Sequence, residues 1–183
     1  GKEHYMELKN IKLSTVEGIL IITINRPEKL NALNFETLTE LRYAVKQVYD
    51  DPVIKGAIVT GEGDKAFVAG ADINEITRLN EINGRKASET GQQIFNEIEN
   101  SPKLFIASLD QLIPKCLEIL KKVAEKPGIA VELIINAVNS AFNKGENGFQ
   151  TEANAFANCI STEDFKEGTQ AFLEKRKPLF HGK

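Results

Sequence analysis

The spacing of apolar residues changes its period near residue 108, and this change constrains the fold strongly. Before it, short apolar runs alternate with amphipathic stretches of helical spacing, whereas only helical spacing is found after it. The apolar runs are 11–16, 19–24, 54–60 and 104–107, and the helical stretches between them are 35–50 and 83–99. Strands that alternate with helices form a largely parallel sheet with crossover connections. We therefore expect an α/β unit over residues 6–108 and a helical region over residues 109–183.

Turn and cap residues set the expected boundaries of these elements. Glu17-Gly18 between the first two apolar runs predicts a hairpin, and Asn34 is a good N-cap for the helix that follows it. In the second half, Asp110 is expected to cap a helix that runs to about residue 126, and Ser161 and Asp164 are spaced as a capping box. The remaining expected elements are helices over 129–142, 149–160 and 161–177 and, at 104–107, a buried strand.

The composition is that of an ordinary globular protein, since 42% of the 183 residues are hydrophobic and 27% are charged. A net charge of -3 disfavours nucleic-acid binding through bulk charge, and no apolar run is long enough for a membrane span. With no basic-then-apolar leader and two isolated cysteines, Cys116 and Cys159, we expect a cytoplasmic protein with reduced thiols. His4 and His181 are the only histidines and lie near the two ends, which argues against His-based nucleophilic or metal sites.

The stretch Lys65-Ala66-Phe67-Val68-Ala69-Gly70-Ala71-Asp72-Ile73 is the best candidate for a functional turn. It reads as a short apolar strand that breaks at Gly70 into a helix capped by Asp72. Because residues 69–71 have almost no side chain, backbone N–H groups are left open beside a helix N-terminus, where an anion or a developing oxyanion is favoured. Close packing of a strand against a helix would use the same small residues, and the residues alone leave both explanations open.

Several motifs together resemble the crotonase (enoyl-CoA hydratase/isomerase) superfamily. They are Asn25-Arg26-Pro27, Asn31-Ala32-Leu33, Val59-Thr60-Gly61 and Lys65 to Asp72 in the first half, and Ser161-Thr162-Glu163-Asp164, Glu167-Gly168 and Ala171 to Arg176 near the end. Within the superfamily, the chain is most similar to bacterial 3-hydroxybutyryl-CoA dehydratases, over roughly residues 6–107 and 109–183. The resemblance implies an α/β fold of ββα units wound into a spiral, here incomplete, with C-terminal helices that assemble trimers or hexamers.

The resemblance also implies what the chain binds, namely a coenzyme A thioester as substrate, with no other cofactor and no metal. Family members polarise the thioester carbonyl with two backbone N–H groups, and the first of these corresponds to Ala71. The expected contacts with CoA are Lys29, Ala32, Ala69, Gly70, Asp72, Ile73, Phe172 and Lys175. Lys29, and Lys175 with Phe172, are expected to meet a phosphate or the adenine, and Asp72 serves chiefly as a helix cap. The alternatives are a solvated loop lysine at position 29, a core aromatic at 172 and a surface charge at 175.

The chain departs from the family after the apolar run at 104–107. In hydratases this strand leads into a glycine-rich turn that supplies the second oxyanion N–H, and two catalytic glutamates follow. Here Ala107-Ser108 joins directly to Leu109-Asp110, where the C-terminal helices begin. No acidic residue of this chain lies in a matching motif, and Glu75, Glu97 and Glu99 read as surface helix positions. Hydration requires positioned acid and base groups.

Two functions are consistent with these observations. The first is that of an enoyl-CoA hydratase or 3-hydroxyacyl-CoA dehydratase that acts on short-chain acyl-CoA thioesters in fatty-acid or butyrate metabolism. The second is a catalytically silent module that binds CoA or supports assembly, because the glutamate pair and the second oxyanion glycine are absent. For the chain as written we expect little or no hydratase activity. The shortened sheet is expected to leave apolar surface at Ile19–Ile24 and Leu104–Ala107 without a partner, which favours a homo-oligomer.

Overall fold

In a computed structural model, which describes residues 7–143 and 145–183, the first part of the chain forms a four-stranded sheet. The strands lie in the order β1 (Ile11–Val16), β2 (Ile19–Ile24), β3 (Gly56–Gly61) and β4 (Leu104–Ala107). β1 is antiparallel to β2, whereas β2, β3 and β4 run parallel, as the alternation of strands and helices predicted. The hairpin at Glu17-Gly18 is confirmed, and both residues have the positive φ that tight hairpin turns require.

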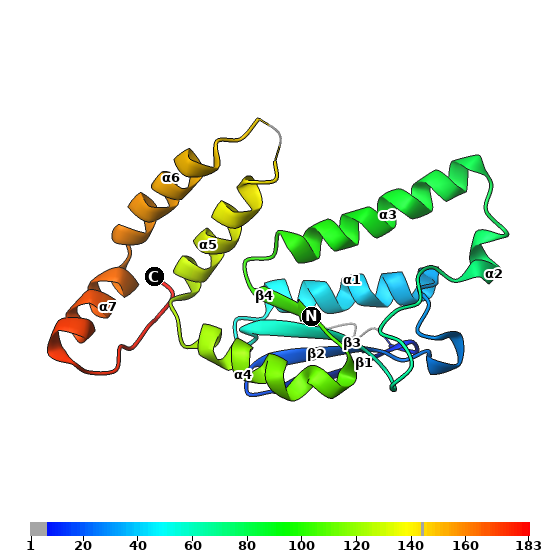
Figure 1. The fold of residues 1–183 in the computed structure, drawn as a ribbon, viewed down its shortest axis with the longest axis horizontal. Helices are drawn as coiled ribbons and strands as arrows, with labels where there is room; N and C mark the ends of the chain where they lie inside the picture. The colour runs from blue at the N-terminus through cyan, green and yellow to red at the C-terminus, as the bar shows by residue number, and fades with distance from the viewer. Residues whose placement is uncertain (1–6, 144) are drawn as a thin grey trace, which may run out of the picture.

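Helices cover both faces of this sheet (Figure 1). α1 (Phe35–Asp50) has the predicted bounds and packs against one face, and α3 (Glu81–Glu99) lies along α1. α4 (Ile113–Ala124) covers the other face. The side chains of β2 point alternately into the two cores, with Leu20, Ile22 and Ile24 on the α1 side and Ile19 and Ile21 on the α4 side. β2 is therefore a strand covered on both faces, as its continuous apolar sequence predicted.

The start of α1 is fixed by side chains on both sides of the helix. The Asn34 side chain accepts a hydrogen bond from the Thr37 N–H at 2.8 Å, which confirms the predicted cap. Further along, the Glu40 side chain is only 1% exposed, and its carboxylate accepts the backbone N–H groups of Lys9 at 3.0 Å and Asn10 at 2.9 Å. Burial of a carboxylate is tolerated where such donors replace water. Glu40 therefore ties α1 to the segment that enters β1.

Two predicted helix starts are wrong. Asp110 lies inside the 3₁₀ turn η2 (Asp110–Leu112), and α4 begins only at Ile113. In an α-helix capped by Asp110, residue 114 would donate the first intrahelical hydrogen bond, and Pro114 has no N–H to donate. α7 (Glu163–Glu174) is capped by Thr162, whose side chain accepts the Phe165 N–H at 3.0 Å, and not by Ser161. The Ser161 hydroxyl instead donates to a carbonyl at the end of α6.

Two further boundaries, and the burial of one strand, differ from expectation. β3 begins at Gly56, because the N–H of Ile54 is used in a turn with Asp51. α7 ends at Glu174, where Lys175 adopts a left-handed conformation with φ of 56°. β4 is a strand as predicted, but its side chains are only partly buried because it lies at the edge of the sheet.

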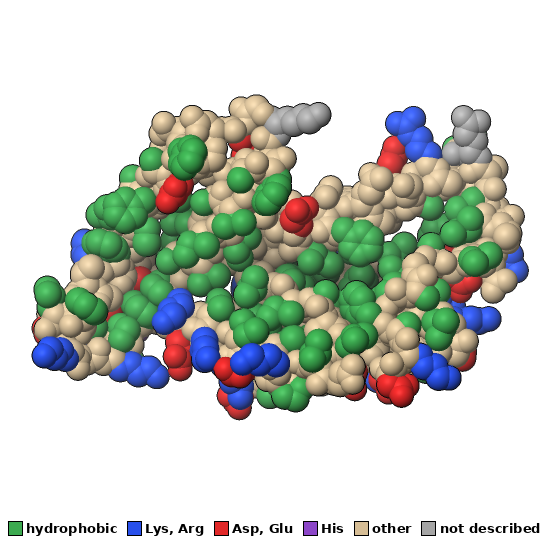
Figure 2. Space-filling view, viewed as in Figure 1, with side chains coloured by type: hydrophobic (Ala, Val, Ile, Leu, Met, Phe, Trp, Pro, Cys, Tyr) green, Lys and Arg blue, Asp and Glu red, His purple; other side chains and the backbone are tan. Residues whose placement is uncertain are grey.

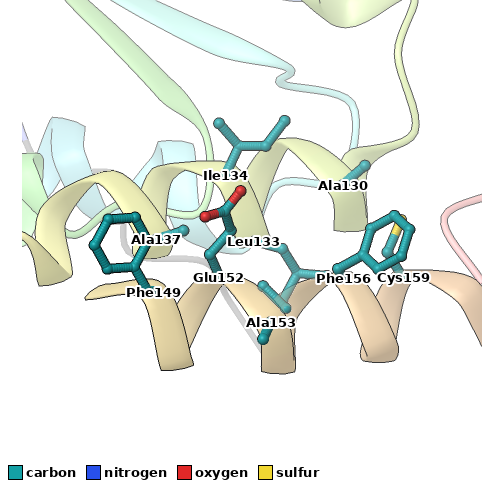
Figure 3. Close-up of a pocket in the computed structure, with 10 residues that line it drawn as sticks. Ala130, Leu133, Ile134, Ala137, Phe149, Glu152, Ala153, Phe156 and Cys159 are labelled. Carbon is teal, nitrogen blue, oxygen red and sulfur yellow. The ribbon is translucent and has the colours of Figure 1, made fainter. Parts of the chain in front are cut away.

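The second part of the chain is a helical arm (Figure 1). α5 (Gly128–Ser140) and α6 (Gly148–Ile160) pack side by side, and α7 follows at the far end of the arm. A groove of about 450 Å³ between α5 and α6 is lined mostly by apolar side chains, with Glu152 among them (Figure 3). Figure 2 shows apolar side chains gathered over this arm, and Ile134, Phe149 and Phe156 are 63%, 86% and 65% exposed. Within residues 7–143 and 145–183, no helix has the length and apolar character needed to cross a membrane.

The apolar surface expected to drive assembly at Ile19–Ile24 is not exposed. Ile19–Ile24 lies between α1 and α4, and most of its side chains are fully buried. α4 occupies the face that the shortened sheet was expected to leave open. The apolar surface that remains uncovered lies on the α5–α6 arm and, in part, at the β4 edge.

Candidate functional site

Two loops meet at the carboxyl-terminal ends of the parallel strands. Residues 25–34 follow β2 and residues 62–72 follow β3. Because β2 and β3 are neighbouring parallel strands, the loops that leave their carboxyl ends lie side by side. In open parallel sheets, ligands bind just outside the carboxyl-terminal ends of the strands. The candidate stretch Lys65–Ile73 thus lies where a binding site is expected on topological grounds.

The two loops are joined by backbone hydrogen bonds, and this pairing replaces the strand predicted before Gly70. The Ala69 N–H donates to Leu30 O at 3.1 Å, the Leu33 N–H donates to Gly70 O at 2.8 Å, and the Asp72 N–H donates to Leu33 O at 2.8 Å. Leu33 and Ala71 form an isolated parallel bridge, and residues 65–69 are irregular. The strand prediction was wrong because this stretch is held by the neighbouring loop and not by the sheet, through the Ala69 N–H to Leu30 O and the Asn31 side chain to Ala66 O.

Asn31 holds the junction of the loops together. Its side chain is 1% exposed, and its amide donates to Glu62 O at 3.0 Å and to Ala66 O at 2.8 Å, while its Oδ1 accepts the Arg26 N–H at 3.0 Å. The residue adopts a left-handed conformation with φ of 57°, which asparagine tolerates better than most residues. From the sequence alone, Asn31 was recognisable only as part of the motif Asn31-Ala32-Leu33.

Gly61, the last residue of β3, lies directly under this junction. A Cβ at this position would lie 2.1 Å from Phe67 O and 2.6 Å from Asn31 Nδ2. The close approach of the loop to the end of β3 therefore requires glycine at position 61. The glycine lets the backbone at Phe67 pass close to the end of β3. The position of Phe67 in turn sets the position of residues 69–71, which follow it.

The Ala71 N–H is the donor that the bridge leaves open. In a parallel bridge centred on Leu33 and Ala71, the bonds are made by the residues on either side of Ala71, as the bonds to Gly70 O and from the Asp72 N–H show. The Ala71 N–H points away from Leu33, and residues 69, 70 and 71 are all exposed. Gly70 has φ of 104°, a conformation that side chains disfavour. Ala71 thus presents a backbone N–H on the outer side of the loop.

Asp72 is a helix cap that also forms a buried ion pair. Its carboxylate accepts the Asn74 N–H at 3.0 Å at the start of the short helix α2 (Ile73–Ile76), and Arg26 Nη2 lies 2.8 Å from Asp72 Oδ2. Arg26 also donates to Ala32 O. The Arg26 guanidinium holds the pKa of the Asp72 carboxyl below its ordinary value, and the more distant charge of Lys29 acts in the same direction. The capping role was predicted, whereas Arg26 as partner was not.

Glu75, the next carboxylate along the chain, is also engaged. Its Oε2 accepts the N–H of Phe35 at 2.7 Å, next to the start of α1. Both acidic residues that follow Ala71 most closely in the sequence therefore already have partners within the fold. Each carboxylate is thus bonded to a partner that ties the loop to another part of the fold.

The remaining predicted CoA contacts fall into two groups. Lys29 ends the 3₁₀ turn η1 (Pro27–Lys29) and is exposed, Ala32 is half-buried beside Arg26, and Ile73 is 72% exposed. These residues lie on the same two loops as Ala71. Phe172 and Lys175 lie on or next to α7, which Figure 1 places at the opposite end of the molecule from α2. Within one chain, the structure does not bring Phe172 and Lys175 to the Ala71 loop.

A cavity of about 290 Å³ separates the two loops on the side of Asn31. Its charged lining residues are Glu28, Glu62, Asp64 and Lys65. An acidic lining of this kind disfavours a phosphate, whereas Lys29 and the open backbone of 69–73 favour one. Nowhere in the described part of the chain do three or more His, Cys, Asp or Glu side chains gather in a way that could hold a metal ion.

Comparison with known proteins identifies the family of this chain. The model of the enoyl-CoA hydratase/isomerase family matches residues 14–110 and 105–183. The chain belongs to this family. The two matched stretches meet at the junction of β4 and η2, where the sequence analysis found that Ala107-Ser108 joins directly to Leu109.

Alignment with similar proteins places a long gap in this chain. The chain is 27% identical over 254 aligned positions to the short-chain-enoyl-CoA hydratase of Clostridium acetobutylicum, with 94% of this chain and 97% of that protein covered. It is 28% identical over 260 positions to the crotonyl-CoA hydratase of Syntrophomonas wolfei, with 97% and 100% covered. Both alignments are longer than the 183 residues of this chain, so a long block of each relative faces a gap in it.

Solved structures confirm the crotonase-like α/β fold with a C-terminal helical region. An enoyl-CoA hydratase from Bacillus anthracis superposes with a TM-score of 0.85 at 24% identity, with 96% of this chain and 100% of that chain covered. Pseudomonas aeruginosa DspI superposes with a TM-score of 0.87 at 18% identity, with 99% and 100% covered. At these identities the likeness establishes the fold alone.

Proposed function

We propose that this chain binds short-chain acyl-CoA thioesters at the edge formed by residues 25–34 and 65–73, with the Ala71 N–H as a donor to the thioester carbonyl. The observation that carries the proposal is the direction of that N–H, which the Leu33–Ala71 bridge turns outward. Preorganised backbone donors of this kind stabilise charge on a carbonyl oxygen. The names of two relatives, a short-chain-enoyl-CoA hydratase and a crotonyl-CoA hydratase, support a short acyl group.

The same loops offer contacts for the rest of the CoA molecule. The Ala69 N–H already donates to Leu30 O, so Ala69 offers its carbonyl to the adenine or ribose, whereas Ala71 offers its N–H. Lys29 is exposed at the end of η1 and meets a phosphate in this proposal, with Ala32 and Ile73 as flanking contacts. The Asp72 carboxylate contributes indirectly, because its bonds to Arg26 and to the Asn74 N–H fix the loop.

Hydration by this chain is proposed to be negligible. The family reaction requires acid and base groups positioned over the substrate, and Asp72 and Glu75 are held by Arg26 and by the Phe35 N–H. Loss of one oxyanion donor slows a reaction by about 10²–10³-fold, and loss of general acid–base groups slows it by about 10²–10⁴-fold. The other function, hydration of enoyl-CoA, is favoured by the names of the relatives and predicts ordinary turnover.

In this proposal, a complete CoA site combines the Ala71 loop of one copy of the chain with Phe172 and Lys175 of a second copy. Both residues are far from Ala71 within one copy and lie on an exposed surface, where Phe172 is 81% exposed. The uncovered apolar side chains of the α5–α6 arm support assembly into a homo-oligomer. A cytoplasmic location, and CoA thioester as the only small molecule needed, remain predictions.

Calorimetric titration with CoA and with crotonyl-CoA tests the binding proposal. We expect Lys29→Ala to weaken both ligands and Lys86→Ala, which alters an exposed lysine of α3, to leave both unchanged. With crotonyl-CoA labelled with ¹³C at the carbonyl, binding should shift the carbonyl resonance in the direction that a hydrogen bond produces. Absence of binding, or equal loss in both variants, would refute the site.

A further inference from the structure

The sequence contains two Asn-Gly pairs, and the structure holds them differently. Asn147-Gly148 lies where the connection between α5 and α6 enters α6, at one end of this helix pair (Figure 1), whereas Asn83-Gly84 lies in the first turn of α3. Both asparagines are exposed and both glycines are half-buried. A difference in their chemistry therefore comes from the backbone and its hydrogen bonds, and not from access to water.

Asparagine is a chemically labile residue, and a glycine after it increases the lability. The backbone nitrogen of the glycine attacks Cγ of the asparagine, the Cγ–Nδ2 bond breaks, and the side-chain nitrogen leaves as ammonia. Water then opens the succinimide ring at one of its two carbonyls, which gives aspartate or isoaspartate. Glycine favours the attack because it has no Cβ to obstruct a close approach. The reaction requires a backbone nitrogen without a hydrogen bond and a side chain that can turn toward it.

The pair Asn83-Gly84 meets neither requirement. The Gly84 N–H donates to Asn80 O at 2.8 Å, which is the first hydrogen bond of α3. The Asn83 side chain accepts the Asn80 N–H at 2.6 Å, and the Asn83 N–H donates to the Asn80 side chain at 3.0 Å. This reciprocal capping box fixes the side chain while the helix fixes the nitrogen. Attack at Asn83 therefore requires the first turn of α3 to open.

The pair Asn147-Gly148 is held much less firmly. Gly148 is the first residue of α6, and N–H groups of a first turn have no acceptor within their own helix. Over residues 7–143 and 145–183, the Gly148 N–H makes no hydrogen bond. The Asn147 side chain accepts the Gln150 N–H at 3.3 Å, which is longer than the usual range for such bonds. Both the attacking nitrogen and the side chain are thus available without unfolding of α6.

We propose that Asn147 is a site of spontaneous deamidation in the folded protein, whereas Asn83 is protected by its helix. Water is the only other reactant, and ammonia is the leaving group. The modification is independent of the proposed CoA site, because the Ala71 loop leads into α2, which Figure 1 places away from α6.

The two products affect α6 differently. Aspartate keeps an oxygen for the Gln150 N–H and adds negative charge at a helix N-terminus, where such charge is favourable. Isoaspartate routes the main chain through Cβ, which lengthens it by one atom directly before Gly148. The Gly148 backbone lies against the end of α5, since a Cβ there would be 3.6 Å from Ser140 Oγ and 3.7 Å from Ala141 Cα. Isoaspartate therefore releases the cap and disturbs the contact between α5 and α6.

The test is incubation of the intact chain at mildly alkaline pH, with peptide mass spectrometry and isoaspartate analysis to follow each asparagine. In the folded protein we expect Asn147 to convert at least tenfold faster than Asn83. In concentrated urea the two rates should agree within about threefold, because both pairs then lack their helices. Equal rates at Asn147 and Asn83 in the folded protein would overturn the proposal.

A pair of glycine variants tests the chemistry of the attack. Gly148→Ala adds a Cβ that meets only ordinary contacts, so the fold should persist while conversion of Asn147 slows at least tenfold. Gly84→Ala is the matched control, since its Cβ meets nothing closer than Leu79 at 3.8 Å, and it should leave the rate at Asn147 unchanged. Conversion of Asn147 in Gly148→Ala at the original rate would contradict attack by the Gly148 nitrogen.

Hydrogen exchange then tests the effect on α6. Exchange of the Gln150 amide should become faster in proportion to the isoaspartate content of the incubated protein, because its acceptor is lost. The variant Asn147→Asp, which corresponds to the other product, should keep the protection of Gln150. Protection that is the same in all three samples would show that the cap at position 147 does not hold the start of α6.

Discussion

Replacing Gly61 by alanine tests the packing that holds the candidate site. The added Cβ would lie 2.1 Å from Phe67 O, 2.6 Å from Asn31 Nδ2 and 2.8 Å from Ala66 O, and two of these three atoms belong to the backbone. Because ordinary contacts of a Cβ begin near 3.4 Å, the loop must retreat by more than an ångström at Phe67. Overpacking costs about 1–3 kcal/mol, and separating the Asn31 amide from its buried carbonyl partners adds about 1–3 kcal/mol. We therefore expect the free energy of unfolding to fall by about 2–6 kcal/mol.

The assay is urea denaturation, followed by titration of the folded variant with crotonyl-CoA. Because the displaced loop carries residues 69–71, Gly61→Ala should also weaken binding. Gly91→Ala is the control, since a Cβ there meets nothing within 4 Å and the residue lies inside α3. Alanine in place of a helical glycine should stabilise the fold by about 0.5–1 kcal/mol and leave binding unchanged. A Gly61→Ala protein with the stability and affinity of the original would show that the loops do not cross β3 as described.

Three further predictions address other contacts. Glu40→Ala should lower the free energy of unfolding by about 2–4 kcal/mol, because it leaves the Lys9 and Asn10 N–H groups without an acceptor, whereas Glu36→Ala, at an exposed site, should cost below about 1 kcal/mol in the same denaturation experiment. Hydrogen bonds from Arg176 and, next in size, from the Leu179 N–H lower the pKa of Glu167 from 4.5 to about 2. These bonds should hold the C-terminal segment fully above about pH 4.5 and be lost as the pH falls toward 2, and hydrogen exchange at Leu179 will report the loss. Exchange that is unchanged over this range would contradict the role of Glu167. Arg26→Gln should loosen the Asp72 loop and weaken crotonyl-CoA binding more than Arg85→Gln in α3, and equal affinities would contradict the positioning role of Arg26.

The elements predicted best from the sequence are those whose signals are local. α1 has the predicted bounds because its apolar period, its Asn34 cap and the stop at Asp51-Pro52 all lie within the element or beside it. β2 was predicted to be buried on both faces because five of its six consecutive residues are apolar, so both faces of the strand carry apolar side chains. The α/β class and the helical second half follow from the same kind of pattern.

The errors arise where distant residues decide the local structure. Residues 65–69 have the apolar sequence of a strand, but Ala66 O and the Ala69 N–H are bonded to Asn31 and Leu30. Nothing near this stretch in the sequence reveals those partners. The partner of Asp72 is Arg26, 46 residues away, and those of Glu40 are backbone groups 30 and 31 residues away. The face of β2 expected to be open is covered by α4, which follows a junction that occurs after β4 in this chain.

The candidate site was predicted in part. The small residues around Gly70 left both close packing and open N–H groups possible, and only the resemblance singled out Ala71. The structure shows that the Leu33–Ala71 bridge turns the Ala71 N–H outward. Lys29, Ala32 and Ile73 lie on the same loops as Ala71, but the separation of Phe172 and Lys175 from them could not be predicted without the fold. Arg26 and Asn31 were visible only as motif residues, since their roles depend on contacts across the two loops.

The central claim is tested most directly by measuring crotonyl-CoA binding and crotonyl-CoA hydration on one sample of the protein. The chain, confirmed by mass spectrometry to have the printed sequence, is first titrated with crotonyl-CoA, and the loss of enoyl-thioester absorbance is then followed at a saturating concentration. The account predicts saturable binding that Lys29→Ala weakens, together with no measurable loss of absorbance beyond the uncatalysed rate. Rapid loss of absorbance, or the absence of any binding, would contradict it.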